Sequence, residues 1–175
     1  SLAVMLIRTL ETVEEVRNLE GLLGDYIRYV CDDLQRHAGV SFDQDVLITN
    51  TMMTLHKVVP PEGRTFVVET AKGDALGMVF LRKSGADAME IKRLFVRPEG
   101  RGTGAGRALV EAAMAEARAM GFAMMRLDSS RTLKAAIALY RSLGFEYRDP
   151  YPESDHYDDH ELSDVLIFME KRLTA

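Results

Sequence analysis

The chain has 175 residues, of which 47% are hydrophobic and 28% are charged, and its formal net charge is −5 at pH 7. This length suits one folded domain with a sizeable core, and the composition is typical of a globular protein. The negative charge argues against nucleic acid as a partner, because broad nucleic-acid binding needs a basic surface. We therefore expect residues 1–175 to form a single domain that does not bind DNA or RNA.

Cysteine content and hydrophobic patterning bear on the location of the protein. Cys31 is the only cysteine, so no disulfide can form within the chain, and a reducing cytoplasm is the expected location. The opening SLAVMLIRTLETVEE has neither the basic nor the apolar region of a signal peptide. No apolar stretch approaches the ~18 residues that a membrane span requires, so we expect no membrane partner.

The first third of the chain reads as a strand followed by helix. Residues 3–8 are short and apolar, which predicts a strand, and residues 9–33 carry apolar side chains at helical spacing. Gly21 and Gly24 weaken the middle of this helix. The pattern therefore allows either two helices or one kinked helix.

Strands dominate the middle of the chain. Residues 37–64 form the least regular part, with a short helix expected near residues 43–56, and such segments are common places for substrate contacts. Strands expected over residues 66–70 and 75–82 flank a polar turn and predict a hairpin. A third strand is expected over residues 88–96.

The third strand leads into a glycine-rich loop. Simple alternation places Glu90, Lys92, Leu94 and Val96 on one face of this strand, and Pro98 prevents the strand from continuing. The elements expected next are a helix over residues 104–120, a strand over 122–128, a helix over 132–143, and strands over 145–147 and 164–171. This order predicts a mixed α/β or α+β domain.

The glycine-rich loop is the most informative stretch of the sequence. It reads RPEGRGTGAGRALV, from Arg97 to Val110, and a helix is expected to begin within it. Glycine lowers backbone stability at a helix start, so this composition indicates that a ligand approaches the main chain closely. Anions are the most common ligands of helix N-termini.

Three phosphate-binding loops use glycines in this way. The nucleotide-triphosphate loop needs Lys-Ser or Lys-Thr after its last glycine, but Gly106 is followed by Arg107-Ala108. The dinucleotide loop G-x-G-x-x-G/A fails because its third position falls on Arg107 or Leu109. The pattern that fits is R-x-x-G-x-G, from Arg101 to Gly106.

This pattern resembles the [QR]-x-x-G-x-[GA] motif of the GNAT superfamily of N-acetyltransferases. The resemblance extends to the strand that ends in VRP, to ALYRSLGF over residues 138–145, and to the order of elements. It implies an acyl-CoA N-acyltransferase fold, with a central, mostly antiparallel sheet flanked by helices. It also implies direct acetyl transfer from acetyl-coenzyme A to a primary amine.

The resemblance implies a cofactor site built from main-chain groups. Successive amides can cradle a diphosphate, and the positive end of the following helix points toward it. The main chain of the preceding strand would bind the pantetheine and polarise the thioester carbonyl. The predicted cofactor-binding residues are Leu94, Phe95, Val96, Arg101, Gly102, Thr103, Gly104, Ala105, Gly106 and Arg107. The alternative is a flexible turn with solvated arginines.

Two residues are predicted to act in catalysis. An alkyl amine has a pKa near ~10.4, so it arrives charged and must lose a proton to a base. Glu90 lies where some GNAT enzymes carry a catalytic glutamate; the alternative is a solvated strand residue or an ion-pair partner of Lys92 or Arg126. Tyr140, in LYRSLGF, would protonate the coenzyme A thiolate; the alternative is a packed core tyrosine.

The chain departs from the family pattern at one position near this tyrosine. Many relatives have an asparagine seven residues earlier that contacts the cofactor, and here that residue is Leu133. Ser129, Ser130 or Arg131 could replace it, and the sequence does not choose among them.

The acidic segment from Glu153 to Asp164 also contains His156 and His160. These residue types suit a zinc or manganese site, but a flexible solvated loop is the preferred interpretation, and we predict no metal. A third interpretation is that the carboxylates attract a cationic amine.

The function expected from the sequence is acetyl-coenzyme A dependent N-acetylation of a small-molecule or peptide amine. A domain of the same fold that binds acyl-coenzyme A without turnover is the alternative. Residues 9–64 and 148–164 are expected to form the acceptor pocket. Homodimers are common among similar proteins, so a homodimer is one assembly that the resemblance allows.

Overall fold

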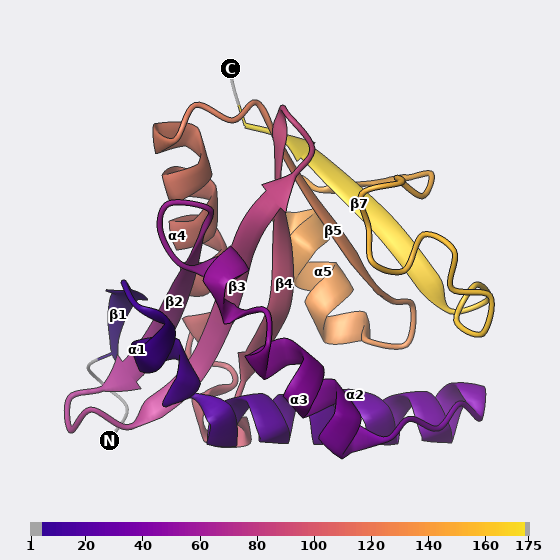
Figure 1. Ribbon diagram of the computed structural model, residues 1–175, viewed down its shortest axis with the longest axis horizontal. Coiled ribbons are helices and arrows are strands. Elements are labelled where there is room, and N and C mark those ends of the chain that lie inside the picture. Colours follow the sequence, from indigo (N-terminus) through magenta and orange to yellow (C-terminus); the bar gives the residue numbers. More distant parts are fainter. Residues whose placement is uncertain (1–4, 174–175) are drawn as a thin grey trace.

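The computed structural model describes residues 5–173, and seven strands form one sheet in the order β1-β2-β3-β4-β5-β7-β6 (Figure 1). The strands are β1 (Met5–Leu10), β2 (Gly63–Thr70), β3 (Ala75–Ser84), β4 (Ala88–Val96), β5 (Met124–Ser130), β6 (Glu146–Arg148) and β7 (Leu166–Arg172). Among the described residues, β4 and β5 form the one parallel pair of neighbours. The predicted mixed, mostly antiparallel sheet is confirmed.

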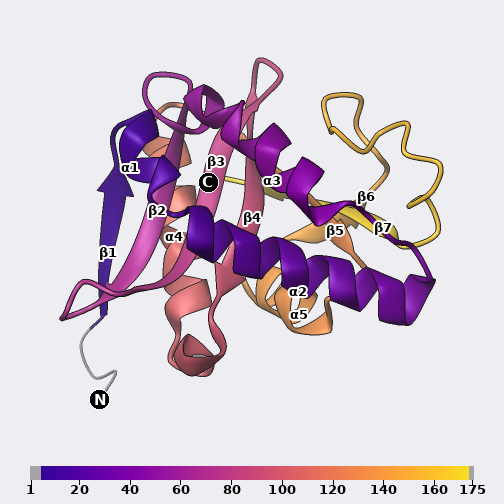
Figure 2. The same ribbon diagram turned by 60° about the horizontal axis from the view of Figure 1, so that its bottom comes forward.

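Helices cover both faces of the sheet (Figures 1 and 2). They are α1 (Val13–Arg17), α2 (Glu20–Ala38), α3 (Gln44–Met52), α4 (Ala105–Ala119) and α5 (Lys134–Ser142), with short 3-10 turns at Leu55–Val58 and Pro98–Gly100. Leu109 and Ala113 of α4 pack with α5 and one face of the sheet. Leu23 and Ile27 of α2 pack with α1 and the other face. No helix within residues 5–173 is long and apolar enough to cross a membrane.

The predicted N-terminal helix consists of two helices, α1 and α2, and the break lies at Asn18–Leu19 rather than at the glycines. α1 ends there in a tighter turn, in which the Leu19 N–H donates to the Val16 carbonyl at 2.9 Å. A side-chain cap fixes where α1 begins. Thr12 Oγ1 accepts the N–H of Glu15 at 3.1 Å, a bond of a kind that contributes about 1 kcal/mol. The strand predicted over residues 3–8 is observed as β1 (Met5–Leu10), and residues 3 and 4 lie outside the described part.

A β-bulge in β4 changes the facing of its side chains. Phe80 lies opposite Lys92 and Met78 lies opposite Phe95, so two residues of β4, Arg93 and Leu94, oppose a single residue of β3. The bulge gives Arg93 a φ of 53°. The prediction that Glu90, Lys92, Leu94 and Val96 share one face is therefore wrong. The extra residue turns Leu94 and Val96 toward α4 and α5.

The parallel strands β4 and β5 separate along their length. Their pairing runs only from Ala88 opposite Met124 to Ile91 opposite Leu127. Beyond that point β4 continues to Val96 and β5 to Ser130, and the two strands diverge toward α2 (Figure 1). The opening between them is where the candidate site lies.

The acidic segment before β7 is packed against the sheet. Tyr151 is 1% exposed, and Ser154, Leu162 and Val165 are also buried. Ser154 and Leu162 lie within residues 153–164, and Tyr151 and Val165 flank this range, so four buried side chains attach the segment to the sheet. Most other residues from 153 to 164 are exposed and form neither helix nor strand, as predicted for a solvated loop.

Two glycines with opposite surroundings test this description of the fold. A Cβ on Gly63 would lie 2.2 Å from the carbonyl oxygen of Lys57 and 2.4 Å from that of Leu81, so Gly63→Ala should lower the free energy of unfolding by about 3 kcal/mol or more. A Cβ on Gly24, inside α2, meets only Ile48 at 3.8 Å. Gly24→Ala should therefore raise it by about 0.5–1 kcal/mol. Urea unfolding measures the free energy of unfolding of each variant. Equal changes in the two variants would contradict the packing around Gly63.

Candidate active site

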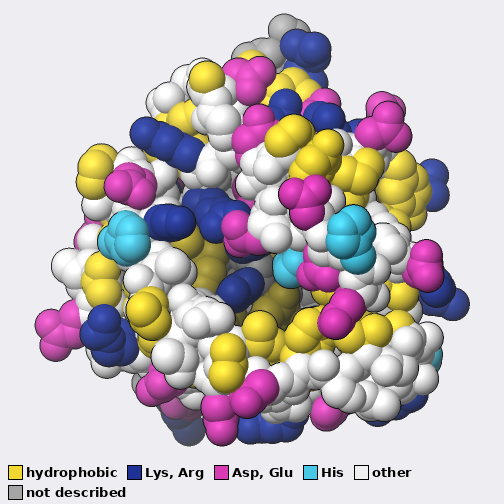
Figure 3. All heavy atoms as spheres, turned by 45° about the vertical axis from the view of Figure 1, so that its right-hand side comes forward, with side chains coloured by type: hydrophobic (Ala, Val, Ile, Leu, Met, Phe, Trp, Pro, Cys, Tyr) yellow, Lys and Arg dark blue, Asp and Glu magenta, His cyan; other side chains and the backbone are white. Residues whose placement is uncertain are grey.

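A cavity of about 200 Å³ lies where β4 and β5 separate, enclosed by α2, α3, α5 and the segment before β7. Its apolar lining includes Ile27, Val30, Leu34, Phe42, Leu47, Leu94, Leu133 and Leu162. Its polar lining includes Tyr26, Arg93, Asp128, Ser129, Ser130, Tyr140 and His156. Figure 3 shows a hollow of this kind, in which basic, acidic and hydrophobic side chains meet. The structure thus brings together residues from 9–64 and 148–164, the two regions expected to form an acceptor pocket.

The glycine-rich loop has the backbone expected of an anion cradle. Gly102 and Gly104 have φ of 76° and 86°, and a Cβ on either would meet nothing within 4 Å. Within residues 5–173, no main-chain N–H from Gly102 to Arg107 donates to a protein acceptor. The amides at the start of α4 are therefore free to bind a ligand, and their surroundings are open.

Side chains of the loop take different roles. Arg101 donates from Nε to the Val96 carbonyl at 3.2 Å, and its guanidinium lies 5.0 Å from the centre of the Tyr29 ring. Arg107 donates to Ser142 Oγ at 2.8 Å. Thr103 Oγ1 donates to the Gly100 carbonyl. The loop is thus braced by its own side chains, while its amides have no acceptor within the described chain.

Gly106 differs from the other loop glycines. A Cβ there would lie 3.4 Å from Leu139 Cδ2 and 3.8 Å from Val96 Cγ2. Its missing side chain makes room for α5 and β4 rather than for a ligand. Ala105 and Phe95, also predicted as cofactor residues, are buried, so only their main-chain groups could contact a cofactor.

Tyr140 lines the cavity and its hydroxyl has no hydrogen-bond partner within the described chain. The ring is buried and packs edge-on against Phe145, with centroids 5.7 Å apart. Burial, followed by the nearby Tyr26 and Asp128, raises the pKa of Tyr140 above its ordinary value. The hydroxyl therefore keeps its proton at neutral pH and has no protein group to give it to.

Glu90 lies beneath the cavity wall and is 1% exposed. Its carboxylate accepts from Arg82 Nε at 3.1 Å and from the Tyr151 hydroxyl at 2.6 Å. Lys92 Nζ lies 3.7 Å away, whereas Arg126 pairs with Glu170 instead. Glu90 is thus enclosed by donors and does not line the cavity.

Asp128 is the carboxylate that does line the cavity, at the point where β5 leaves β4. It accepts from Ser154 Oγ at 2.7 Å and lies 3.8 Å from Lys92 Nζ. Its side chain is 8% exposed. Sequence reasoning placed Asp128 only as a strand end; the signal was a carboxylate that closes an apolar strand, FAMMRLD.

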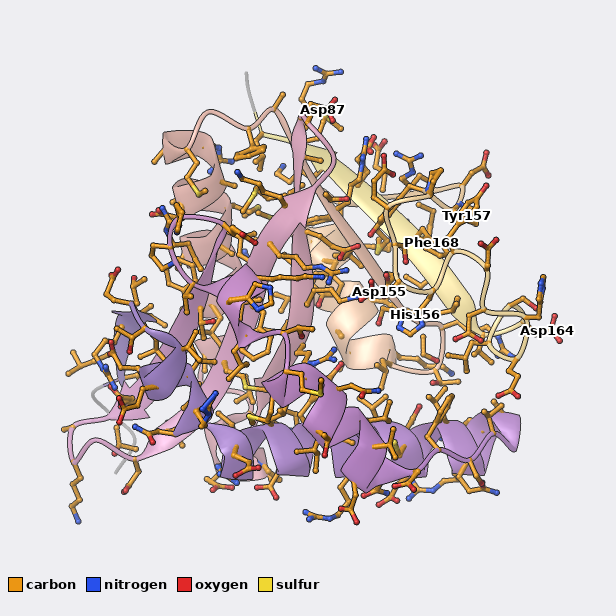
Figure 4. The ribbon with its side chains drawn as sticks, in the orientation of Figure 1. Asp87, Asp155, His156, Tyr157, Asp164 and Phe168 are labelled. Carbon is orange, nitrogen blue, oxygen red and sulfur yellow. The ribbon has the colours of Figure 1, made fainter. Side chains whose placement is uncertain are left out.

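Asp155 and His156, from the segment before β7, lie beside these strands (Figure 4). Asp155 Oδ2 is 3.0 Å from Arg82 Nη2 and 3.7 Å from Lys92 Nζ. Burial alone would raise the pKa of Asp155, but the hydrogen bond from Arg82 and the charge of Lys92 outweigh it and lower the pKa. Asp155 thus belongs to a network with Glu90, Lys92 and Asp128.

Two of the three proposed substitutes for the family asparagine, Ser129 and Ser130, line the cavity. Leu133 precedes α5 and lines the cavity without a side-chain cap. Ser130 Oγ is hydrogen-bonded to Thr132 Oγ1, and Arg131 donates to the Asp164 carbonyl at 3.0 Å. Cys31 is buried on α2, as expected for a packed helical residue. No cluster of three His, Cys, Asp or Glu residues in the described chain has the geometry to hold a metal ion.

Comparisons with known proteins agree with this geometry. Residues 61–147 match the acetyltransferase (GNAT) domain family. The chain is 32% identical over 156 residues to IAA acetyltransferase of Azospirillum brasilense, an alignment that covers 88% of this chain and 95% of that protein. It is 39% identical over 98 residues to an uncharacterized N-acetyltransferase of Schizosaccharomyces pombe, covering 55% of this chain and 60% of that protein.

A solved structure has the same fold. The PaiA N-acetyltransferase of Thermoplasma acidophilum, in complex with coenzyme A, superposes with a TM-score of 0.71 at 18% identity. The superposition covers 97% of this chain and 99% of that one. The fold, the motif and the sequence relationships are consistent with one another. The chain therefore belongs to the GNAT family of acetyltransferases.

Proposed function

We propose that this protein transfers an acetyl group directly from acetyl-coenzyme A to a primary amine held in the cavity. The observation that supports this most is the row of free amides from Gly102 to Arg107 at the edge of the β4–β5 opening. A neighbour of the same fold has been solved in complex with coenzyme A. The PaiA and IAA acetyltransferase names of the similar proteins do not define the acceptor of this chain.

The residues present fit the donor. The amides of the loop, at the positive end of α4, suit the diphosphate. The edge of β4 from Leu94 to Val96 has no strand partner on its β5 side, so its main-chain groups are available to the pantetheine. When bound, acetyl-coenzyme A supplies a thioester carbonyl that is already activated toward amines.

Asp128 is proposed to bind the acceptor amine and take its proton. It is the carboxylate at the cavity surface, whereas Glu90, the base predicted from the resemblance, lies behind it. The two carboxylates share Lys92, at 3.8 Å and 3.7 Å. Glu90 is therefore proposed as a positioning residue that holds Lys92 and Tyr151, rather than as the group that contacts the amine.

Tyr140 is proposed to protonate the departing thiolate. Its hydroxyl lines the cavity without a protein partner, and its raised pKa keeps it protonated, so that it can donate its proton to the thiolate as the C–S bond breaks. Family resemblance assigns the same role to the tyrosine of this helix. The acid and the base would thus come from α5 and β5, on neighbouring walls of the cavity.

Gly104 tests the diphosphate site, and the chain offers a matched control at the other end of α4. Gly104 and Gly121 have φ of 86° and 87°, and a Cβ on either meets nothing within 4 Å. Alanine at either position should cost about 1–2 kcal/mol of stability through left-handed strain. Only Gly104→Ala should weaken coenzyme A binding, by about tenfold, measured by calorimetry. Equal affinities in the two variants would remove the loop from the donor site.

Tyr140→Phe tests the acid. We expect kcat to fall about 100-fold with unchanged affinity for coenzyme A, measured by thiol release and calorimetry. Because the pKa of Tyr140 is raised, its hydroxyl stays protonated at pH values where an ordinary tyrosine, with a pKa near ~10, ionises. In the wild type, kcat should therefore not fall between about pH 9 and 11. A fall in that interval that disappears in Tyr140→Phe would show an unshifted pKa and contradict the structure.

Asp128→Asn and Glu90→Gln distinguish a carboxylate that contacts the acceptor amine from one that only positions Lys92 and Tyr151. Asp128→Asn should lower kcat/KM for the amine about 100-fold with little change in stability. Glu90→Gln should chiefly destabilise the fold, by about 3 kcal/mol, because it leaves Arg82 with only the more exposed Asp155 as a counter-charge. Steady-state kinetics and thermal unfolding give both values. Full activity in Asp128→Asn, with a large kcat loss in a stable Glu90→Gln, would return the base role to Glu90.

A further inference from the structure

Arg93 is a basic residue in the cavity wall that has no carboxylate partner. Lys92 and Arg82 lie close by in the sheet and both pair with Glu90 and Asp155. Within the described chain no Asp or Glu oxygen lies within 4.0 Å of Arg93. Its positive charge therefore remains uncompensated beside the cavity.

The hydrogen-bond donors of Arg93 are only partly satisfied. Nη2 donates to Thr51 Oγ1 of α3 at 2.7 Å. Nε is buried and has no acceptor within residues 5–173, and no protein acceptor is found there for Nη1. A buried donor without an acceptor costs free energy, so such a group indicates an absent partner.

The backbone also maintains this arrangement at a cost. Arg93 has a φ of 53°, which is unfavourable for a residue with a side chain. The strain comes from the bulge, and bulges redirect side chains near functional sites. Here the bulge places a guanidinium where β4 leaves β5. A guanidinium is the side chain best suited to bind a carboxylate through two hydrogen bonds.

The rest of the cavity defines what else the ligand carries. Asp128 on β5 provides one negative charge, and both Asp128 and Arg93 line the same cavity. Both also act on Tyr26: burial raises the pKa of its hydroxyl, Arg93 opposes this rise, and Asp128 adds to it. The wall formed by α2 and α3 is apolar apart from the Tyr26 hydroxyl. One cation, one anion and an apolar wall surround a space of about 200 Å³.

We propose that the acceptor is an α-amino acid or a similar amino-carboxylate with an apolar side group, whose carboxylate binds Arg93 and whose amine binds Asp128. This proposal rests on the proposed acetyltransferase function and narrows its acceptor. A polycationic amine fits less well, because Arg93 would repel it. Asp155, the loop carboxylate nearest the site, is already neutralised by Arg82 and Lys92.

Matched acceptors test the proposal directly. Leucine, methionine and phenylalanine are each compared with the amine that lacks the carboxylate and with the amino-acid amide, using thiol release from acetyl-coenzyme A. In the wild type, kcat/KM for at least one amino acid should exceed that of its amine and its amide by about 100-fold. The comparison with the amide shows whether the site requires a free carboxylate or also accepts the carbonyl of a peptide.

Variants then assign the effect to Arg93. Arg93→Gln should lower kcat/KM for the amino acid about 100-fold, lower the ratio of kcat/KM for the amino acid to that for the corresponding amine by a similar factor, and leave coenzyme A affinity unchanged. Arg93→Lys should restore part of the loss, since lysine keeps the charge. Arg64→Gln is the control: Arg64 is a half-buried arginine on β2 that pairs with Glu116 of α4, outside the cavity. It should change none of these ratios.

The outcomes separate this proposal from the proposed function. If amines without a carboxylate react as well as the amino acids, or if Arg93→Gln leaves the ratio unchanged, the carboxylate site is wrong and the acetyltransferase function stands. If coenzyme A binds but no acceptor releases thiol, the proposed function fails. Calorimetry of the amino acids with the coenzyme A complex then decides: binding lost in Arg93→Gln supports the site, and no binding to the wild type overturns it.

Discussion

The separation of β4 from β5 after Ile91 is the constraint on which the site depends. Strands inside a sheet satisfy their main-chain groups with each other, so two strands that part leave donors and acceptors that water or a ligand must satisfy. The glycine-rich loop follows β4 directly, and α4 begins there with its amides free. One topological feature thus aligns an open strand edge with an anion cradle. Such an arrangement suits a long ligand with an anionic end and a hydrogen-bonding arm.

The charged network beneath the cavity holds the segment before β7 in place. Tyr151 and Asp155 of that segment contact Glu90 and Arg82 of the sheet, and Ser154 contacts Asp128. Buried ion pairs contribute little net stability, since desolvation offsets their attraction, but they specify geometry. The network therefore fixes where the cavity wall lies rather than how stable the fold is. It also neutralises Asp155, the one carboxylate of that segment within the network.

What the sequence could predict depended on the range of the interactions involved. The cradle and Tyr140 follow from local patterns: glycines at positions that need positive φ, and a helix with an apolar stripe. The facing of Leu94 and Val96 could not be predicted, because a single extra residue in β4 has no signature in simple alternation. The burial of Glu90 could not be predicted either, since its cover, Tyr151, comes from 61 residues further along the chain. Arg93 was not predicted, because the bulge that places it has no signature in simple alternation. Asp128 was not predicted, because its neighbours are set by the order of the strands in the sheet.

The placement of Arg93 also bears on how the acceptor would lose its proton. An amine must be neutral to attack a thioester, and a nearby positive charge disfavours the ammonium form, as does removal from water. Arg93 supplies that charge in a largely apolar cavity, while Asp128 offers a place for the proton. A carboxylate on the acceptor would satisfy Arg93, so binding and deprotonation would involve the same two residues. In that arrangement, Arg93 selects the acceptor through its carboxylate, and Asp128 converts the selected acceptor into a nucleophile.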